Sequence, residues 1–123
     1  MDEITLLQAE VLRTMAHPRR IQILHELADG PIEVRRLASH VGATQPNVSQ
    51  HLAAMRSVGL VDSERDGREV RYRLTDRRSV EACELMRTVI ADRLRRLAEM
   101  TRDDGPRVAA AADSSAAIGS ASR

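Results

Sequence analysis

Hydrophobic residues recur every three or four positions in five segments of the chain, a spacing typical of amphipathic helices. The predicted helices cover residues 4–15, 18–28, 32–41, 44–58 and 76–101. Turn-forming residues separate them. Asp29-Gly30-Pro31 ends the second segment, and Gly42 follows the third, where a left-handed C-cap is expected.

Between residues 61 and 74 the apolar period changes from about 3.6 to 2, which predicts two β-strands. Asp66-Gly67 lies between the two alternating runs and predicts a two-residue hairpin turn. The expected fold is therefore mainly α with a small β-hairpin (α+β), in the order α-α-α-α-β-β-α. Because two short helices around Gly42 are followed directly by a hairpin, the pattern indicates a winged helix-turn-helix.

The segment 44–58 has the features of a helix that enters the DNA major groove. Val48, Leu52 and Met55 form a narrow apolar stripe, and no acidic residue lies between them. Thr44 is a suitable N-cap, and Pro46 falls in the first turn, where its missing N–H costs least. Short amides and hydroxyls at this end can donate to and accept from base edges. The candidate DNA-contacting residues here are Thr44, Gln45, Asn47, Ser49, Gln50, His51 and Arg56. The alternative is an uncharged surface helix without a partner.

Arginines mark the predicted hairpin as a second candidate contact. Arg65 and Arg68 flank its tip, and Arg71 and Arg73 lie along its polar side. Guanidinium groups suit phosphate contact, and those at the tip could reach a minor groove. The candidate contacts are Arg65, Arg68 and Arg71. Four acidic residues share the hairpin, so the alternative is a solvated edge strand that charge keeps soluble.

Three motifs in this order resemble the ArsR/SmtB family of winged-helix bacterial regulators. They are Met-Ala-His-Pro-Arg-Arg-Ile-Gln-Ile-Leu at 15–24, Thr-Gln-Pro-Asn-Val-Ser-Gln-His-Leu at 44–52, and Gly-Leu-Val at 59–61 with Arg-Asp-Gly-Arg at 65–68 and Tyr-Arg-Leu at 72–74. The resemblance covers about residues 5–100. It implies a homodimer that binds operator DNA near a promoter, with repression as the expected action, and that responds to an effector.

Apolar surplus at both ends of the predicted domain agrees with a dimer. The resemblance implies that the first and last helices build the interface, and segment 4–15 carries two apolar stripes. The alternative is a last helix that covers its own subunit. We expect one DNA-binding and dimerisation domain over residues 1–102. From residue 103 the chain is rich in alanine and serine, and we expect 103–123 to be a disordered tail.

The effector is not indicated by the sequence. The resemblance implies metal sensing through thiolates before the recognition helix or through histidines and carboxylates in the last helix. Here residues 32–41 lack cysteine and 76–102 lack histidine, so we predict no certain metal site or cofactor. The alternative is a divergent nickel or zinc site that combines a histidine with carboxylates across the dimer. The single cysteine, Cys83, is interpreted as a small buried hydrophobe, with pairing to its twin or oxidation as the alternative.

Composition excludes several classes of protein. The 123 residues carry a net charge of +1 and one cysteine, and contain no run resembling a membrane helix or signal peptide. We therefore expect a cytoplasmic protein with no membrane partner. No glycine-rich phosphate loop or nucleophile–base set indicates an enzyme. The remaining alternative is a winged helix used as a protein-interaction module, which would carry large apolar or acidic residues on its recognition face.

Overall fold

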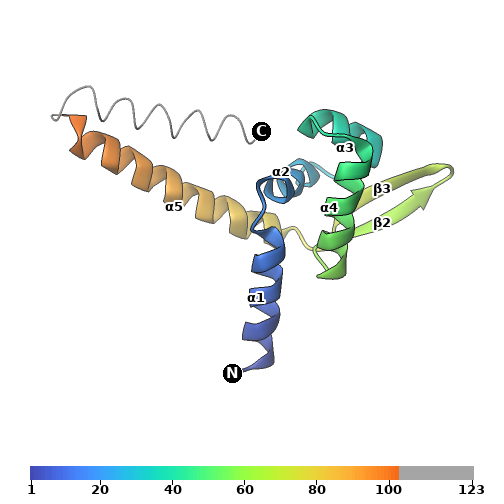
Figure 1. Cartoon of the computed structure of the whole chain (residues 1–123), viewed down its shortest axis with the longest axis horizontal. Coiled ribbons are helices and arrows are strands. Elements are labelled where there is room, and N and C mark those ends of the chain that lie inside the picture. Colours follow the sequence, from blue (N-terminus) through green and yellow to red (C-terminus); the bar gives the residue numbers. More distant parts are fainter. Residues whose placement is uncertain (103–123) are drawn as a thin grey trace. The chain divides into compact units, whose positions relative to one another are not determined.

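The computed structural model describes residues 1–102, and within that range it contains five helices and three strands (Figure 1). The helices are α1 Glu3–Met15, α2 Pro18–Leu27, α3 Val34–Val41, α4 Gln45–Ser57 and α5 Arg78–Met100. The strands are β1 Ile32–Glu33, β2 Val61–Asp66 and β3 Glu69–Leu74. Residues up to Val80 form one compact unit, and α5 continues from Glu81 in a second. The predicted tail at 103–123 lies outside the described residues.

Local sequence chemistry fixes the helix ends. The Asp2 carboxylate accepts a hydrogen bond from the Thr5 N–H at 2.7 Å and caps α1. The Nδ1 atom of His17 accepts from the Arg19 N–H at 3.2 Å and caps α2, whose first residue is proline. Gly42 ends α3 with a φ of 69°, the left-handed conformation that glycine adopts without strain. These contacts confirm the predicted role of His17 at a helix entry.

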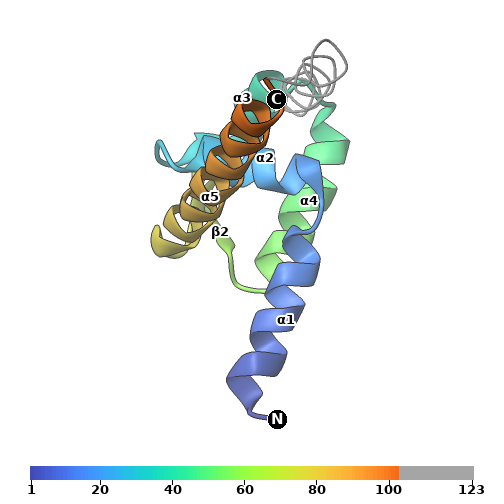
Figure 2. The same ribbon diagram turned by 90° about the vertical axis from the view of Figure 1, so that its left-hand side faces the viewer.

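The core lies where α2, α3 and α4 meet above the start of the hairpin. Its buried apolar residues are Met15, Ile23, Leu24, Leu27, Leu37, Ala38, Val41, Val48, Leu52, Met55, Leu60, Val61 and Val80. Contacts join α2 to both α3 and α4, while α1 reaches α2 and α4 near its C-terminal end. The N-terminal part of α1 extends away from them (Figures 1 and 2). Because α1 buries only Met15, most of its apolar surface stays outside this core.

A three-stranded antiparallel sheet, in the order β1-β3-β2, replaces the simple hairpin that the sequence predicts. The pattern predicts a helix from residue 32, but Ile32 and Glu33 form β1 and pair with Tyr72 and Arg71 of β3. The helical stripe itself begins at Val34, so the two residues before it carry no helical signal. A strand of two residues is too short to show alternation, and only its pairing with β3 reveals it.

The hairpin turn is displaced by one residue from the predicted Asp66-Gly67. Asp66 pairs with Glu69, which leaves Gly67 and Arg68 as the two-residue loop. Gly67 has a φ of 64°, and no residue other than glycine has a positive φ in the described range. A glycine at the first loop position suits a type II′ turn, whereas a loop beginning at Asp66 would require a positive φ at the aspartate.

Candidate nucleic-acid interface

The N-terminal end of α4 is shaped as a site that accepts negative charge. The Thr44 hydroxyl accepts a hydrogen bond from the Asn47 N–H at 3.3 Å, and Pro46 lies in the first turn as predicted. No acidic residue occupies this turn. The positive end of the helix dipole and the unpaired amide N–H groups therefore face outward without a carboxylate to neutralise them.

The two sides of α4 differ completely in chemistry. Val48, Leu52 and Met55 are fully buried, as the apolar stripe predicts. The exposed positions from the N-cap to residue 53 carry small or uncharged polar side chains: Thr44, Gln45, Pro46, Asn47, Gln50 and Ala53. Ser49 is half-buried beside them. The structure therefore brings five of the predicted contacts, from Thr44 to Gln50, together at one end of the helix.

His51 does not share this exposed face, contrary to the prediction that it contacts DNA. Its side chain is only 9% exposed, and its Nδ1 accepts a hydrogen bond from the Arg20 Nε at 3.1 Å. The ring also lies against His17, with 4.5 Å between centroids. The sequence held a signal for this position, because 48, 51, 52 and 55 follow the i, i+3, i+4, i+7 spacing of a buried face.

Arg56 lies at the opposite end of α4 from the polar group. It is exposed, and its guanidinium approaches the Asp62 carboxylate of β2 at 3.7 Å. Exposed ion pairs of this length contribute little to stability, so the side chain can still turn toward a phosphate. Its position suits a contact with the DNA backbone better than a contact with a base edge.

Arginines along the polar side of the hairpin lie close to carboxylates of the same and the neighbouring strand. The Arg71 guanidinium lies 3.7 Å from Glu69 and 4.0 Å from Asp66. Arg73 lies 3.8 Å from both Asp62 and Glu64. A phosphate at Arg71, one of the predicted contacts, would have to compete with two nearby carboxylates, although both ion pairs are exposed and therefore weak.

Arginines at the tip of the hairpin are placed differently. Arg65 pairs with Val70 on the face opposite the acidic residues, and Arg68 stands in the loop. Both are exposed, and neither takes part in an ion pair among residues 1–102. The tip therefore holds the two hairpin arginines whose charge is available to an anion.

The structure also reveals one candidate for a backbone contact, Arg36, that the sequence-based set omits. Arg36 is exposed in the first turn of α3 and has no ion pair in the described part of the chain, whereas its neighbour Arg35 pairs with Glu33 at 3.3 Å. The first helix of a helix-turn-helix crosses the DNA backbone. The cluster of arginines after residue 34 was a usable signal, but only the structure distinguishes the paired arginine from the unpaired one.

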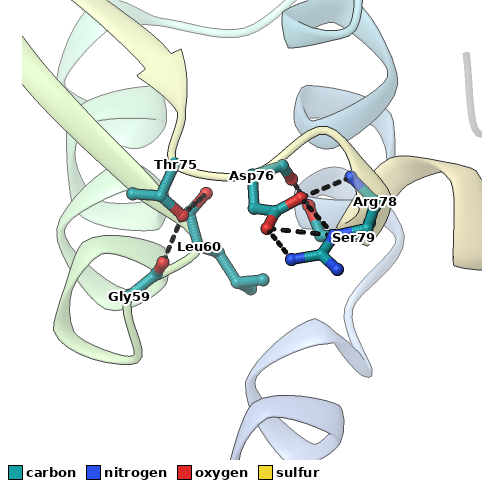
Figure 3. Close-up of polar contacts among 6 residues, drawn as sticks. All are labelled: Gly59, Leu60, Thr75, Asp76, Arg78 and Ser79. Carbon is teal, nitrogen blue, oxygen red and sulfur yellow. Dashed lines mark hydrogen bonds and ion pairs between the residues drawn. The ribbon is translucent and has the colours of Figure 1, made fainter.

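A polar junction connects the end of the recognition helix to the end of the hairpin (Figure 3). The Thr75 hydroxyl donates to the carbonyl oxygens of Gly59 at 2.5 Å and Leu60 at 3.1 Å, and the Thr75 N–H donates to the same Leu60 oxygen at 3.1 Å. These bonds hold β3 against the residues that follow α4. These hydrogen bonds therefore help to fix the orientation of the hairpin relative to α4.

The last helix begins at Arg78, two residues later than predicted, and Asp76 lies just before it as a capping residue. Its carboxylate accepts from the Arg78 backbone N–H at 2.9 Å and from the Arg78 guanidinium at 2.7 Å (Figure 3). These hydrogen bonds to Arg78 lower the pKa of Asp76 to about 2. The cap is therefore intact throughout the physiological range and is lost only in strong acid.

Residues 1–102 contain no group of three or more histidine, cysteine or carboxylate side chains placed to hold a metal ion. Glu26 and His40 meet as a pair, 3.2 Å apart, which falls short of the three or four donors of a zinc site. Cys83 in α5 is half-buried, and burial raises the pKa of its thiol. A raised pKa reduces the thiolate fraction and favours the interpretation of Cys83 as a small hydrophobe.

No helix in the described part of the chain is both long enough and apolar enough to cross a membrane. The long last helix, α5, alternates apolar positions with arginines and carboxylates along its length. It is therefore amphipathic and not continuously apolar.

The chain is similar in sequence to known regulators. Residues 17–63 match the arsR family of bacterial regulatory proteins. The chain is 43% identical over 84 residues to the HTH-type transcriptional regulator CmtR of Mycobacterium bovis, which covers 68% of this chain and 71% of that protein. It is 45% identical over 73 residues to KmtR of Mycobacterium tuberculosis, covering 59% of this chain and 56% of KmtR. The match therefore spans little more than half of KmtR.

Solved structures share the fold. The crystal structure of Rv0081 from M. tuberculosis matches with a TM-score of 0.68 and 35% identity, over 76% of this chain and 95% of that one. The homodimeric winged helix-turn-helix DNA-binding domain of Mb0332 from M. bovis matches with a TM-score of 0.63 and 32% identity, over 72% and 82% of the two chains. The architecture and these likenesses place the protein with transcription regulators and not with enzymes. The chain belongs to the ArsR family of winged helix-turn-helix, DNA-binding transcriptional regulators.

Proposed function

We propose that this protein binds operator DNA as a homodimer, with α4 in the major groove, and represses transcription from the bound site. The observation that carries the proposal is the exposed N-terminal half of α4, which combines short amides and hydroxyls with the complete absence of acidic side chains in its first turn. A protein-interaction surface would offer large apolar or acidic groups there, and this face offers neither.

The base-reading residues in this proposal are Gln45, Asn47 and Gln50. Their amides can both donate and accept, as bidentate recognition of an adenine edge requires. The Thr44 hydroxyl and the half-buried Ser49 border them. Gln45 and Asn47 lie in the first turn, at the end of the helix that meets base edges in this type of motif.

Backbone contacts in this proposal come from three places around α4. Arg65 and Arg68 supply charge from the wing tip, Arg36 from the start of α3, and Arg56 from the far end of α4. Such contacts fix the register of the protein on the duplex but read no sequence. Arg71 has a smaller part, because two carboxylates, Asp66 and Glu69, lie close to it and compete with a phosphate.

Exposed apolar side chains on α1 and α5 support the proposed homodimer. The large apolar residues exposed on α1 are Ile4, Leu6, Leu7 and Leu12, and those on α5 are Leu85, Met86, Val89, Ile90, Leu94, Leu97 and Met100. Ile4 is 77% exposed and Leu85 is 68% exposed. Apolar surface of this extent marks an interaction site. A second copy of the chain is the proposed occupant, as in the homodimeric Mb0332 domain.

Among residues 1–102 of one chain, the donors for a nickel or zinc site do not come together. We place the protein in the cytoplasm, because a regulator of this kind must reach the chromosome.

Replacing the side-chain amides that are proposed to contact base edges tests the proposal. Gln45→Ala and Gln50→Ala should each weaken binding to the preferred duplex by about 1–3 kcal/mol, because each removes hydrogen bonds to a base edge. The duplex is first recovered from a random-sequence library with the purified full chain, and affinity is then measured by fluorescence anisotropy. Binding to a shuffled duplex of the same composition should change little.

Ser57→Ala is the matched control for these changes. Ser57 is exposed on the same helix but at its C-terminal end, where its hydroxyl bonds only to the Ala54 carbonyl. Its removal should leave the preference for the selected duplex intact. If Gln45→Ala and Gln50→Ala bind the selected duplex like the unchanged protein, α4 is not the reading helix.

Arginines at the tip of the hairpin and arginines along its strands should contribute differently to the salt dependence of DNA affinity. Arg68→Ala should lower the slope of log affinity against log salt by about 1 per subunit, because one phosphate contact is lost. Arg73→Ala removes a guanidinium that faces Asp62 and Glu64, so its slope should match that of the unchanged protein. Anisotropy titrations between low and moderate salt provide the slopes. Equal slopes for Arg68→Ala and the unchanged chain would remove the tip from the interface.

A further inference from the structure

One guanidinium joins three helices of the first unit. The Nε of Arg20 in α2 donates to the Nδ1 of His51 in α4 at 3.1 Å, and its Nη1 donates to the Thr14 carbonyl in the last turn of α1 at 3.1 Å. Arg20 is half-buried and His51 is buried. The orientation of the recognition helix relative to α1 therefore depends on a polar link and not on apolar packing alone.

The acceptor role fixes the protonation state of His51. Nδ1 can accept from Arg20 only while it carries no proton, so the imidazole must be neutral. The titratable and charged groups that act on it are His17, which caps α2, and Arg19 and Arg20 within α2, all of them bases. Burial lowers the pKa of His51 from its usual 6.5, and the charges of His17, Arg20 and Arg19 lower it further. The neutral form is thus favoured near pH 7.

Contacts of a second arginine also connect α2 to the helix-turn-helix. The guanidinium of Arg19, the residue before Arg20, donates to the Val41 carbonyl at the end of α3 and to the Gln22 side chain at 2.8 Å. Consecutive arginines of α2 thus bind the ends or sides of all three other helices around it. Neither the Arg19 nor the Arg20 guanidinium has an acidic partner among the ion pairs of residues 1–102.

We infer that Arg20 and His51 are positioning residues for DNA recognition, which hold α4 against α1 through a neutral imidazole, and that protonation of His51 releases this link. The inference rests on the proposed function, in which α1 helps to set the spacing of two reading helices. When His51 takes a proton, Nδ1 becomes a donor that faces the Arg20 N–H, and a further positive charge is added beside those of Arg19 and Arg20. Acid should therefore weaken specific binding while the chain remains folded.

The effect of acid on folding has the same sign. Because the folded chain keeps the pKa of His51 below 6.5, the unfolded chain takes up a proton first as the pH falls. The free energy of unfolding therefore decreases as pH falls through 6.5, and this loss is complete below the folded-state pKa. Thermal unfolding at each pH identifies the range in which binding can be measured on folded protein.

The test compares pH profiles of specific and non-specific binding. The affinity of the full chain for the selected duplex should fall steadily as the pH is lowered from 7.5 to 5, and the loss should stay below about tenfold at pH 5.5 because the pKa of His51 lies below 6.5. Its affinity for the shuffled duplex should not fall, because added positive charge favours phosphate contact. Anisotropy at fixed salt measures both.

Variants at position 51 separate positioning from simple packing. In His51→Asn the amide oxygen can accept in place of Nδ1 but does not titrate. Its affinity at pH 7.5 should lie within about threefold of the unchanged chain, and its profile should be flat. His51→Leu should be weaker by about tenfold at every pH, since the acceptor is absent. If His51→Leu fails to fold, the comparison between the unchanged chain and His51→Asn still decides.

Two further variants complete the test. Arg20→Lys keeps the charge but lacks the planar fork that reaches Thr14 and His51 together, and it should lose about tenfold in specific affinity. His17→Asn is the matched control, since it removes the adjacent exposed imidazole and keeps a capping acceptor; its acid-induced loss should persist. Parallel profiles for the unchanged chain and His51→Asn, or full affinity in Arg20→Lys, would overturn the inference. Failure of the unchanged chain to prefer the selected duplex at pH 7.5 would instead refute the proposed function.

Discussion

Ile90→Asp is expected to make the full chain monomeric and to reduce its affinity for the selected duplex by at least about 100-fold. Ile90 lies near the middle of α5 and is 53% exposed, so a charge there costs the single chain little. Between two copies the same carboxylate would be buried against apolar side chains without a partner. Each half of the operator would then be bound separately, and the gain from binding both halves at once would be lost.

Sedimentation measures the association state, and anisotropy measures DNA binding. The sedimentation experiment uses about 10 µM protein, roughly a thousand times a typical dissociation constant for an operator. Thr88→Asp is the matched control. It places the same charge on α5 two residues earlier, roughly 200° around the helix and off the apolar stripe. This variant should remain dimeric. A dimeric Ile90→Asp protein with undiminished affinity would mean that the apolar face of α5 covers its own subunit instead.

Leu52→Ala is expected to lower the free energy of unfolding by about 2–5 kcal/mol, the range for a truncated leucine in a packed core. Leu52 is fully buried in α4. Gln50→Ala, two positions away on the exposed side, should change this free energy by no more than about 0.5 kcal/mol. Urea unfolding followed by circular dichroism, at one fixed protein concentration, provides both values because unfolding of a dimer depends on concentration.

The two variants together distinguish the role of the exposed face of α4 from that of its buried face. Gln50→Ala should lose specific DNA binding and keep its stability, whereas Leu52→Ala should lose stability and, at a temperature where it is folded, retain most of its preference for the selected duplex. A loss of less than about 1 kcal/mol in Leu52→Ala would show that the helix is not anchored through this side chain.

The helix-turn-helix could be predicted because its signals are local. The Thr44 cap, the first-turn Pro46 and the left-handed Gly42 each depend on residues within one turn, and all three were confirmed. The order of the helices and the position of the hairpin followed from a change of apolar period between residues 59 and 61. Interactions over three or four positions leave a clear pattern in sequence.

Features that depend on distant pairing could not be predicted in the same way. Strand β1 exists because Ile32 meets Tyr72, forty positions later, and the turn moved by one residue because Gly67 takes the positive φ. The approach of Asp66 to Arg71 depends on the register between the two strands of the hairpin. These differences change which wing arginines are available to DNA, although the wing itself was confirmed.

His51 combines one feature that the sequence contains with one that only the structure shows. Its place on the buried face follows from its spacing to Val48, Leu52 and Met55, so the sequence already contained that information. Its hydrogen bond to Arg20 joins residues 31 positions apart and could only come from the packing of α2 against α4. A residue expected to touch DNA is therefore better placed to orient the helix that we propose to enter the groove.

The most direct test of the central claim is the sequence preference of the protein before and after one substitution on α4. Duplexes are selected from a random library with the unchanged chain and, in parallel, with Gln50→Ala. The account predicts a two-fold symmetric preferred sequence, and a loss of base preference at the same position in both halves when Gln50 is replaced. An identical preferred sequence for the two proteins, or one without symmetry, would contradict it.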